Sequence, residues 1–496
     1  MQDIQMNLDS SHHGTIVAEV LALLISITDI DTLRNSDMKA RLDSLTYEEL
    51  SSSSTETHQV HSNQQSMGIS TSDDPLTILD PTIHSLGYMY FITARCLKAT
   101  DQQTTLYLYN TLNQFANVAD LEQLKLAGPS MERIVMALDH VAKIQNNELL
   151  PLVPLYILIT RLSSSDTTAN LNLSNGILTI FHPALAKQCI LSKMYRYPLS
   201  ILNHDIVNVD PETYGTTIQH YLSYHYYGGI LYIGNKEFEK AFDFFSLVVS
   251  APTQKAVSAI QLEAYKRYIL VSLIRYGQVC TLPRYASNAI EKIIRKRHAP
   301  YLNLMNAFDD IKKLISVIQK HHQVFDLDGL LGLTKQLIQA SYRQKIKMLT
   351  KVYVKVKLDD IYAQLSGDTP PSPSTSSYLL SKYQVETLLV DMIGNNDIQA
   401  SISIVSMDNG SQVKMVHFDE EQGSVPFSDQ RLEQAIINIT RINDQLSKVD
   451  QREGLNKDFQ SKYMVLSANG GQLASSSSAF DEDMDVPLDE DTKRYM

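Results

Sequence analysis

The pattern of apolar and polar residues predicts a mainly helical chain. Apolar positions with helical spacing, separated by short polar breaks, run from residue 75 to about residue 333. We expect helices at 85–98, 105–118, 130–144 and 149–162. Turn-like breaks are expected at Asn175-Gly176 and His182-Pro183. Strand signals are rare before residue 399.

The most specific pattern within this region lies at 217–252. Gly229, Tyr232, Ala241 and Phe245 have the spacing of a tetratricopeptide-like unit, a helical hairpin that repeats about every 34 residues. Gly229 allows close helix approach, and the aromatic side chains fill the space between the helices. One hairpin alone exposes an apolar face, so it needs stacked neighbours. We therefore expect residues 75–333 to form a right-handed α-solenoid, whose surface serves either as packing or as a binding site.

A different unit follows at 334–418, where the pattern indicates a winged-helix subdomain. Ile338, Tyr342, Ile346, Leu349 and Tyr353 mark one face of a helix. A short strand is expected around Val356, then a helix near Ile361 capped by Asp359 or Asp360, an exposed loop insertion at 369–373 and a third helix at 382–393. Two strands with alternating apolar residues, at 401–406 and 412–418, flank Asn409-Gly410, a strong hairpin signal.

The last regular pattern predicts a helix at 429–449. Apolar residues recur there at alternating gaps of three and four, which is a heptad seam. The seam consists of Leu432, Ala435, Ile439, Ile442, Leu446 and Val449. Three heptads are too short to be stable alone, so the helix needs partner helices in a bundle.

Three segments of the chain remain outside these patterns. Residues 1–50 are read as an N-terminal helical segment, 51–74 as a flexible linker rich in Ser and Thr, and 451–496 as a disordered acidic tail. Ser478 stands three residues before Asp481 in that tail, a setting suited to an acid-directed kinase.

Charge and composition narrow the function. The 496 residues include 43 Lys and Arg against 55 Asp and Glu, a net charge of -12. This argues against a dedicated nucleic-acid-binding protein, which needs a basic surface. Two local basic stretches stand out, one at 292–297 near a helix end and one at 335–357 in the winged-helix region, so nucleic-acid binding by the winged helix stays open as an alternative.

Motifs for catalysis, metals or cofactors are not found. The sequence has no HExxH, GxSxG or P-loop pattern. His220 and His225 are five residues apart, which turns them away from each other on a helix. The three cysteines are far apart, which fits a reducing compartment, and the apolar stretch at 16–30 is too short to span a membrane. We expect neither an enzyme nor a cofactor-binding protein.

Several segments of the chain resemble the PCI family, which is shared by the proteasome lid, the constitutive-photomorphogenesis (COP nine) signalosome and a translation initiation factor. The resemblance rests on residues 356–361, 385–389, 392–393 and 398–402. The loop at 394–397 is longer than the acid-glycine pair usual in the family. Within the family, residues 226–229, 238–241, 262–274 and 332–336 are most similar to the signalosome's third-subunit branch.

The resemblance implies a non-catalytic scaffold subunit of the complex that deneddylates cullin-RING ubiquitin ligases, located in cytoplasm and nucleus. Its implied partners are other signalosome subunits, of the PCI and metalloprotease types, and cullin-RING ligases through the complex. The wing strands, at Ile402, Ile404, Val413 and Met415, would pair with neighbouring subunits, and the heptad helix would enter a shared bundle. The alternatives are a subunit of the proteasome lid or of another PCI complex, and a nucleic-acid-binding winged helix.

Overall fold

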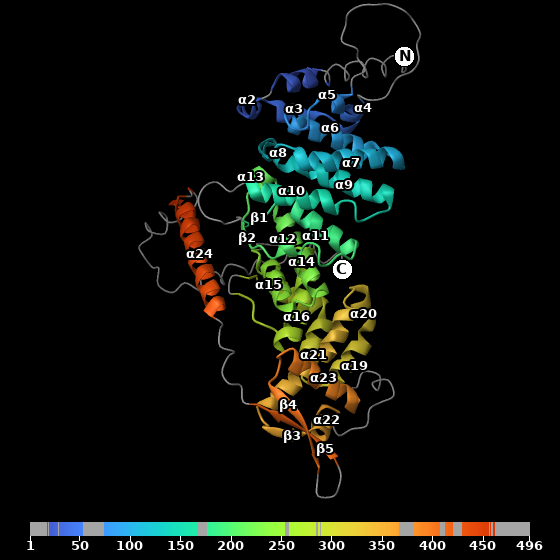
Figure 1. Cartoon of the computed structure of the whole chain (residues 1–496), viewed down its shortest axis with the longest axis vertical. Helices are drawn as coiled ribbons and strands as arrows, with labels where there is room; N and C mark the ends of the chain where they lie inside the picture. The colour runs from blue at the N-terminus through green and yellow to red at the C-terminus, as the bar shows by residue number, and fades with distance from the viewer. Residues whose placement is uncertain are drawn as a thin grey trace, which may run out of the picture. The chain divides into compact units, whose positions relative to one another are not determined.

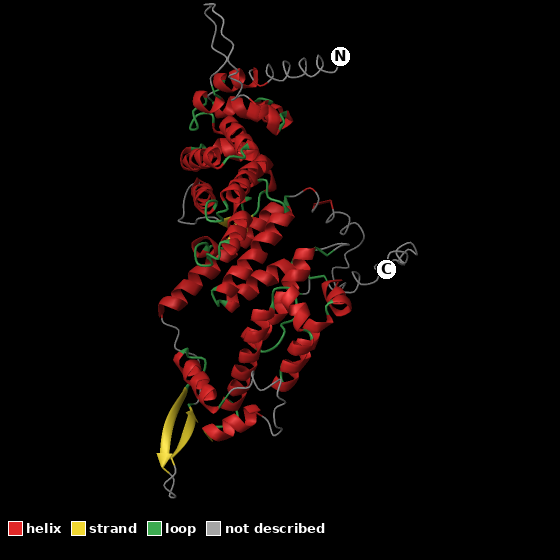
Figure 2. Ribbon diagram, turned by 90° about the vertical axis from the view of Figure 1, so that its right-hand side faces the viewer, coloured by secondary structure: helices red, strands yellow, loops and turns green. Residues whose placement is uncertain are grey.

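The described chain is mainly helical, as the sequence predicts. A computed structural model describes residues 17, 19–27, 29–52, 74–165, 176–252, 257–283, 286–287, 289–366, 381–406, 412–419, 429–455, 457 and 460–461. Figure 2 shows these residues mostly as helices, with one prominent pair of strands. The chain divides into two compact units: residues up to 398 together with 404–415, and the other wing residues together with the terminal helix.

The first helices match the predicted periodicity closely. They are α2 (Ile30–Asn35), α3 (Met38–Ser44), α4 (Tyr47–Ser52), α5 (Pro75–Ile78), α6 (Ser85–Lys98), α7 (Gln102–Val118), α8 (Leu121–Ala127), a 3-10 turn (Gly128–Met131), α9 (Glu132–Gln145) and α10 (Leu152–Ser165). Helix α7 begins three residues earlier than predicted because the side chain of Asp101 accepts hydrogen bonds from the backbone N–H of Gln103 and Thr104. The predicted linker is shorter than 51–74, since Ser51 and Ser52 belong to α4 and Asp74 caps α5; residues 53–73 lie outside the described part.

The break predicted at His182-Pro183 is wrong. Both residues lie in the first turn of α11 (Phe181–Leu191), where proline is tolerated because its missing N–H has no partner in the helix. The ring of His182 accepts a 3.1 Å hydrogen bond from the backbone N–H of Thr179 and so fixes the helix start. The strands β1 (Gly176–Ile177) and β2 (Ile206–Asn208) pair in parallel on either side of this region and were not predicted. Short helices α12 (Leu199–Leu202) and α13 (Pro211–Tyr214) flank β2.

The tetratricopeptide-like hairpin is present where its spacing predicts it. Helices α14 (Ile218–Gly234) and α15 (Phe238–Ser250) pack against each other, and α16 (Ala259–Tyr276) packs on α15. A Cβ atom on Gly229 would lie 2.7 Å from the Phe245 ring, so only glycine permits this approach. Helices that pack on one another lead from α4 through α6, α9, α7, α10, α11 and α14 to α16, and Figure 1 shows this part of the chain as a stack that runs from the blue helices to the green ones. This is the stacked arrangement expected of helical repeats.

Five helices continue from the repeats towards the winged helix. They are α17 (Ala289–Arg297), α18 (Ala299–Ala307), α19 (Ile311–Lys320), α20 (His322–Leu327) and α21 (Leu331–Thr350). Helix α21 packs against both α16 and α19, and its predicted face is buried at Ile338, Tyr342 and Ile346. Tyr353 lies beyond the end of α21 and is partly exposed, so its inclusion in that face is wrong.

The winged-helix order of elements is confirmed. Strand β3 (Lys355–Lys357) is followed by α22 (Leu358–Ser366), α23 (Lys382–Gly394), β4 (Ala400–Ser406) and β5 (Gln412–Phe418), and the sheet order is β3-β5-β4. Helix α22 begins at Leu358, so Asp359 and Asp360 lie in its first turn instead of capping it. The expected hairpin turn at 407–411 and the loop insertion at 369–373 fall outside the described residues. The last helix, α24 (Asp429–Gly454), is longer than predicted.

Candidate assembly surfaces

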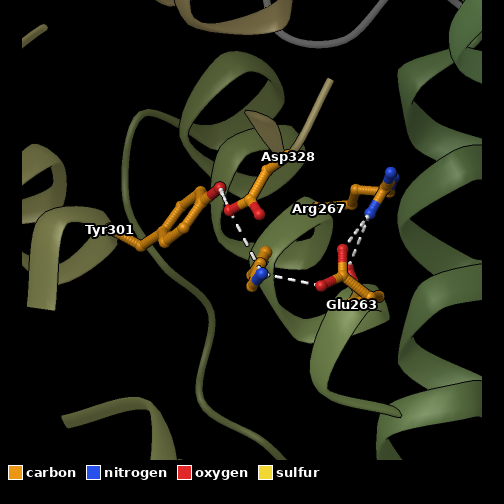
Figure 3. A network of polar contacts seen from close by, with 5 residues as sticks. Glu263, Arg267, Tyr301 and Asp328 are labelled. Carbon is orange, nitrogen blue, oxygen red and sulfur yellow. Dashed lines mark hydrogen bonds and ion pairs between the residues drawn. The ribbon is translucent and has the colours of Figure 1, made fainter. Parts of the chain in front are cut away.

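A buried network of charged groups joins α16 to α18 and to the end of α20 (Figure 3). Lys266 is 2% exposed, and its ammonium lies 2.6 Å from a carboxylate oxygen of Glu263 and 3.1 Å from one of Asp328. The hydroxyl of Tyr301 donates a 2.5 Å hydrogen bond to Asp328. The second carboxylate oxygen of Glu263 binds Arg267 at 3.0 Å. Each charge is therefore opposed by another, as burial requires.

The pKa shifts in this network follow from its hydrogen bonds. Burial by itself would raise the pKa of Asp328, but the hydrogen bonds from Tyr301 and Lys266 outweigh it and leave that pKa below its usual value. Burial, together with donation to Asp328, raises the pKa of Tyr301. Both groups thus keep their ordinary charge state, and the network fixes helices in place without supplying an acid or a base near neutral pH.

The other histidines and cysteines considered as candidates for chemistry have structural roles. The ring of His220 accepts a 3.1 Å hydrogen bond from the backbone N–H of Thr217 in a capping box. Burial lowers the pKa of His225 to about 4. Cys96 and Cys189 are buried free thiols whose pKa burial raises to about 12. Among the residues that the structure describes, no group of three or more His, Cys, Asp or Glu side chains is arranged to hold a metal ion.

Helix α24 carries a row of exposed apolar side chains. Leu432, Ile439, Ile442, Leu446 and Val449 are between 41% and 66% exposed. Ala435 belongs to the same helix, but its side chain is not among those described. Ile436, which the strict heptad pattern omits, is 56% exposed and lies next to the seam at position e. The stripe is therefore wider than a two-stranded seam and has the width of a helix that packs on more than one neighbour.

The two edges of the wing sheet differ in chemistry. Strands β3 and β4 are the outer strands. On β3, Lys355 and Lys357 are exposed and flank the buried Val356, which is how sheet edges are protected from pairing. On β4 the exposed residues are serines and apolar side chains, among them Ile404 and the unpredicted Val405.

The predicted wing residues differ in exposure. Ile404 is exposed, whereas Ile402, Val413 and Met415 are half-buried. Val416 and Phe418 are the residues of β5 that reach the core. Strand β4 is thus the uncharged open edge of the sheet.

The exposed side chains of helix α23 suit a contact with another protein better than they suit DNA recognition. Its basic residue, Lys382, forms an ion pair with Asp359. One of its two acidic residues, Glu386, pairs with Lys414 of β5 at 2.5 Å. Tyr383 and Val390, which are spaced seven apart, are exposed. A recognition helix needs free donors for bases and phosphates, which these ion pairs do not offer.

A groove of about 870 Å³ opens between α15, the end of α16, α21 and the turn after α23. Its charged residues are largely neutralised in pairs, with Arg275 3.1 Å from Glu239 and Lys347 3.1 Å from Asp397. Such balanced charge does not select a ligand of either sign.

None of the helices in the described part of the chain is both long and apolar enough to cross a membrane.

Comparison with known proteins agrees with this architecture. Residues 45–290 match the family described as COP9 signalosome complex subunit 3, N-terminal helical repeats, and residues 318–407 match the PCI domain. The chain is 34% identical over 287 residues to COP9 signalosome complex subunit 3 of Arabidopsis thaliana, covering 57% of this chain and 63% of that protein. It is 28% identical over 407 residues to the Dictyostelium discoideum protein of the same name, covering 81% of this chain and 90% of that protein. The match to the Arabidopsis protein therefore spans somewhat less than two thirds of its length. With helical repeats followed by a winged helix in both sequence and structure, the chain resembles COP9 signalosome complex subunit 3 and carries a region that matches the PCI domain.

Proposed function

We propose that the chain is a scaffold subunit of the COP9 signalosome, acting by protein assembly and without catalysis of its own. The observation that carries this proposal is the row of exposed apolar side chains on α24, in a chain similar to proteins named as subunits of that complex. Contiguous apolar surface in water is unfavourable, and contact with partner helices removes it. The match to the subunit 3 repeats favours the signalosome over the proteasome lid.

The open edge at β4 supplies a second contact. An outer strand presents a row of backbone N–H and C=O groups without partners in the sheet, and a strand from another subunit can pair with them. We expect β4 to be the paired edge, with Ile402 and Ile404 on the pairing strand and Val413 and Met415 on the next strand, β5, because the exposed lysines of β3 oppose pairing there.

Other parts of the proposal follow from the resemblance. Partners are expected to be other PCI subunits and a metalloprotease-type subunit, with cullin-RING ligases reached through the complex, in cytoplasm and nucleus. The charge pairing on α23 supports assembly over nucleic-acid binding. Ser478 is proposed as a phosphorylation site from its acidic sequence context. This proposal is wrong if mass spectrometry of the native protein finds no phosphate on Ser478.

The test compares two matched triple variants of the full chain. Ile439, Ile442 and Leu446 are changed together to Asp, which should place three charges on the apolar stripe and prevent co-purification with the other PCI subunits. In the control, Thr440, Ser447 and Gln451 are changed to Asp, which adds the same charge to α24 at heptad positions b and f, away from the stripe. Equal co-purification of the two variants would refute the role of the stripe.

A further inference from the structure

Helix α17 (Ala289–Arg297) presents a basic face away from the core. Ile290 and Ile294 are fully buried and fix the rotation of the helix, which packs against α16 and α18. Lys292, Arg295 and Lys296 are therefore exposed together, since residues three and four apart share one side of a helix. Arg297 is exposed at the last residue of the helix. We call these four residues the α17 basic face.

These four cations outnumber Glu291, the one acidic residue of α17, and no hydrogen bond or ion pair joins Glu291 to any of them. None of the four side chains makes a hydrogen bond or an ion pair with any described residue, whereas Lys266, Arg267 and Arg275 nearby on α16 are all paired. Positive charge in the last turn complements the helix dipole, but this effect reaches only the last turn and does not account for Lys292 near the middle. Mutual repulsion of four unpaired charges on nine residues is a cost that an anionic partner relieves.

We propose that the α17 basic face binds a short acidic segment of a partner protein. The helix is nine residues long, about 13 Å at the usual rise per residue, which matches a few carboxylates on an extended peptide. A nucleic acid is a poorer match because it continues beyond this short face onto a chain whose net charge of -12 repels further phosphates. The site is distinct from α24 and from the wing, so it stands or falls separately from the proposed scaffold function.

The test measures binding of a fluorescein-labelled oligoglutamate peptide to the full-length chain by fluorescence anisotropy at low salt. The variant Lys292→Glu/Lys296→Glu is expected to bind at least about tenfold more weakly, since each reversal replaces an attraction by a repulsion. The control Lys98→Glu/Lys143→Glu makes the same change of net charge in the last turns of α6 and α9 and should bind like the unchanged chain. The neutral variant Lys292→Gln/Lys296→Gln, which avoids new repulsion, should show a smaller loss.

Three results would overturn the proposal. They are no binding to the unchanged chain, equal binding by the test and control variants, and tighter binding of a labelled DNA duplex that the same Lys292 and Lys296 changes abolish. The last would assign the face to nucleic acid. Circular dichroism of all variants should be identical, because the changed side chains lie on the surface.

Discussion

Replacing Lys266 by Met tests whether the buried ion network stabilises the repeat domain. Methionine keeps the packing of the aliphatic stem and removes the ammonium together with its contacts to Glu263 and Asp328. Asp328 retains the hydroxyl of Tyr301, and Glu263 retains Arg267. The change therefore isolates the contribution of one buried positive charge.

The magnitude follows from the exposure of the partners. The side chain of Lys266 is 3% exposed, but those of Asp328 and Glu263 are 22% and 36% exposed, so water partly replaces the lost contacts. Removing one member of a fully buried pair costs about 3–5 kcal/mol, and hydration of both carboxylates lowers this to about 2–3 kcal/mol. Lys313→Met is the matched control, because the Lys313 pair with Asp310 is 3.4 Å long and largely exposed. It should cost less than about 1 kcal/mol.

Denaturant unfolding of both variants, followed by circular dichroism, gives the two free-energy changes. A double-mutant cycle with Asp328→Asn should show a coupling of about 1–2 kcal/mol between Lys266 and Asp328. If Lys266→Met costs no more than Lys313→Met, or if the coupling is near zero, the network does not stabilise the fold.

Two further predictions concern packing and pH. Gly229→Ala should destabilise the chain by about 1–2 kcal/mol because the new methyl group meets the Phe245 ring. The control Gly332→Ala in α21 has no atom within 4 Å of its new Cβ and should be neutral or slightly stabilising. Equal thermal unfolding midpoints of the two variants would contradict the close contact between α14 and α15. Burial lowers the pKa of His182 and of His225 to about 4. As the pH falls, both histidines are therefore protonated in the unfolded chain before they are protonated in the folded one. This difference leaves the free energy of unfolding unchanged above pH 6.5 and lowers it as the pH falls from 6.5 towards 4. At pH 5.5 the loss of unfolding free energy should be about 1.4 kcal/mol for each histidine. The check is the drop in urea midpoint between pH 7 and pH 5.5. If a His182→Gln/His225→Gln variant shows the same drop as the unchanged chain, these histidines do not cause the loss of stability.

The repeat hairpin and the winged helix are predictable from the sequence because their signals are local. The spacing of Gly229, Tyr232 and Phe245 reflects packing between two successive helices, and alternation along β4 and β5 marks a hairpin. The start of α11 is missed because the residue before a proline normally leaves the helical conformation, whereas here the ring of His182 accepts the backbone N–H of Thr179 and caps the helix. Strands β1 and β2 are missed because two or three residues cannot show an alternation.

The less predictable features depend on distant partners. Lys266 lies in an apolar segment and gives no local sign of being buried, since Asp328 follows it by 62 residues. Ile436 is omitted from the predicted surface because the strict heptad pattern considers two positions only, while a helix in a bundle uses three. On α17, by contrast, the basic cluster is visible in the sequence, but only the structure shows that its charges have no partners among the described residues.

The most direct test of the scaffold assignment is to purify the tagged, otherwise unchanged chain under native conditions and to identify its partners by mass spectrometry. We predict the other signalosome subunits, including PCI-type and metalloprotease-type proteins, in constant proportion to the tagged chain. Recovery of proteasome lid subunits in their place, or of the tagged chain alone, would contradict the assignment.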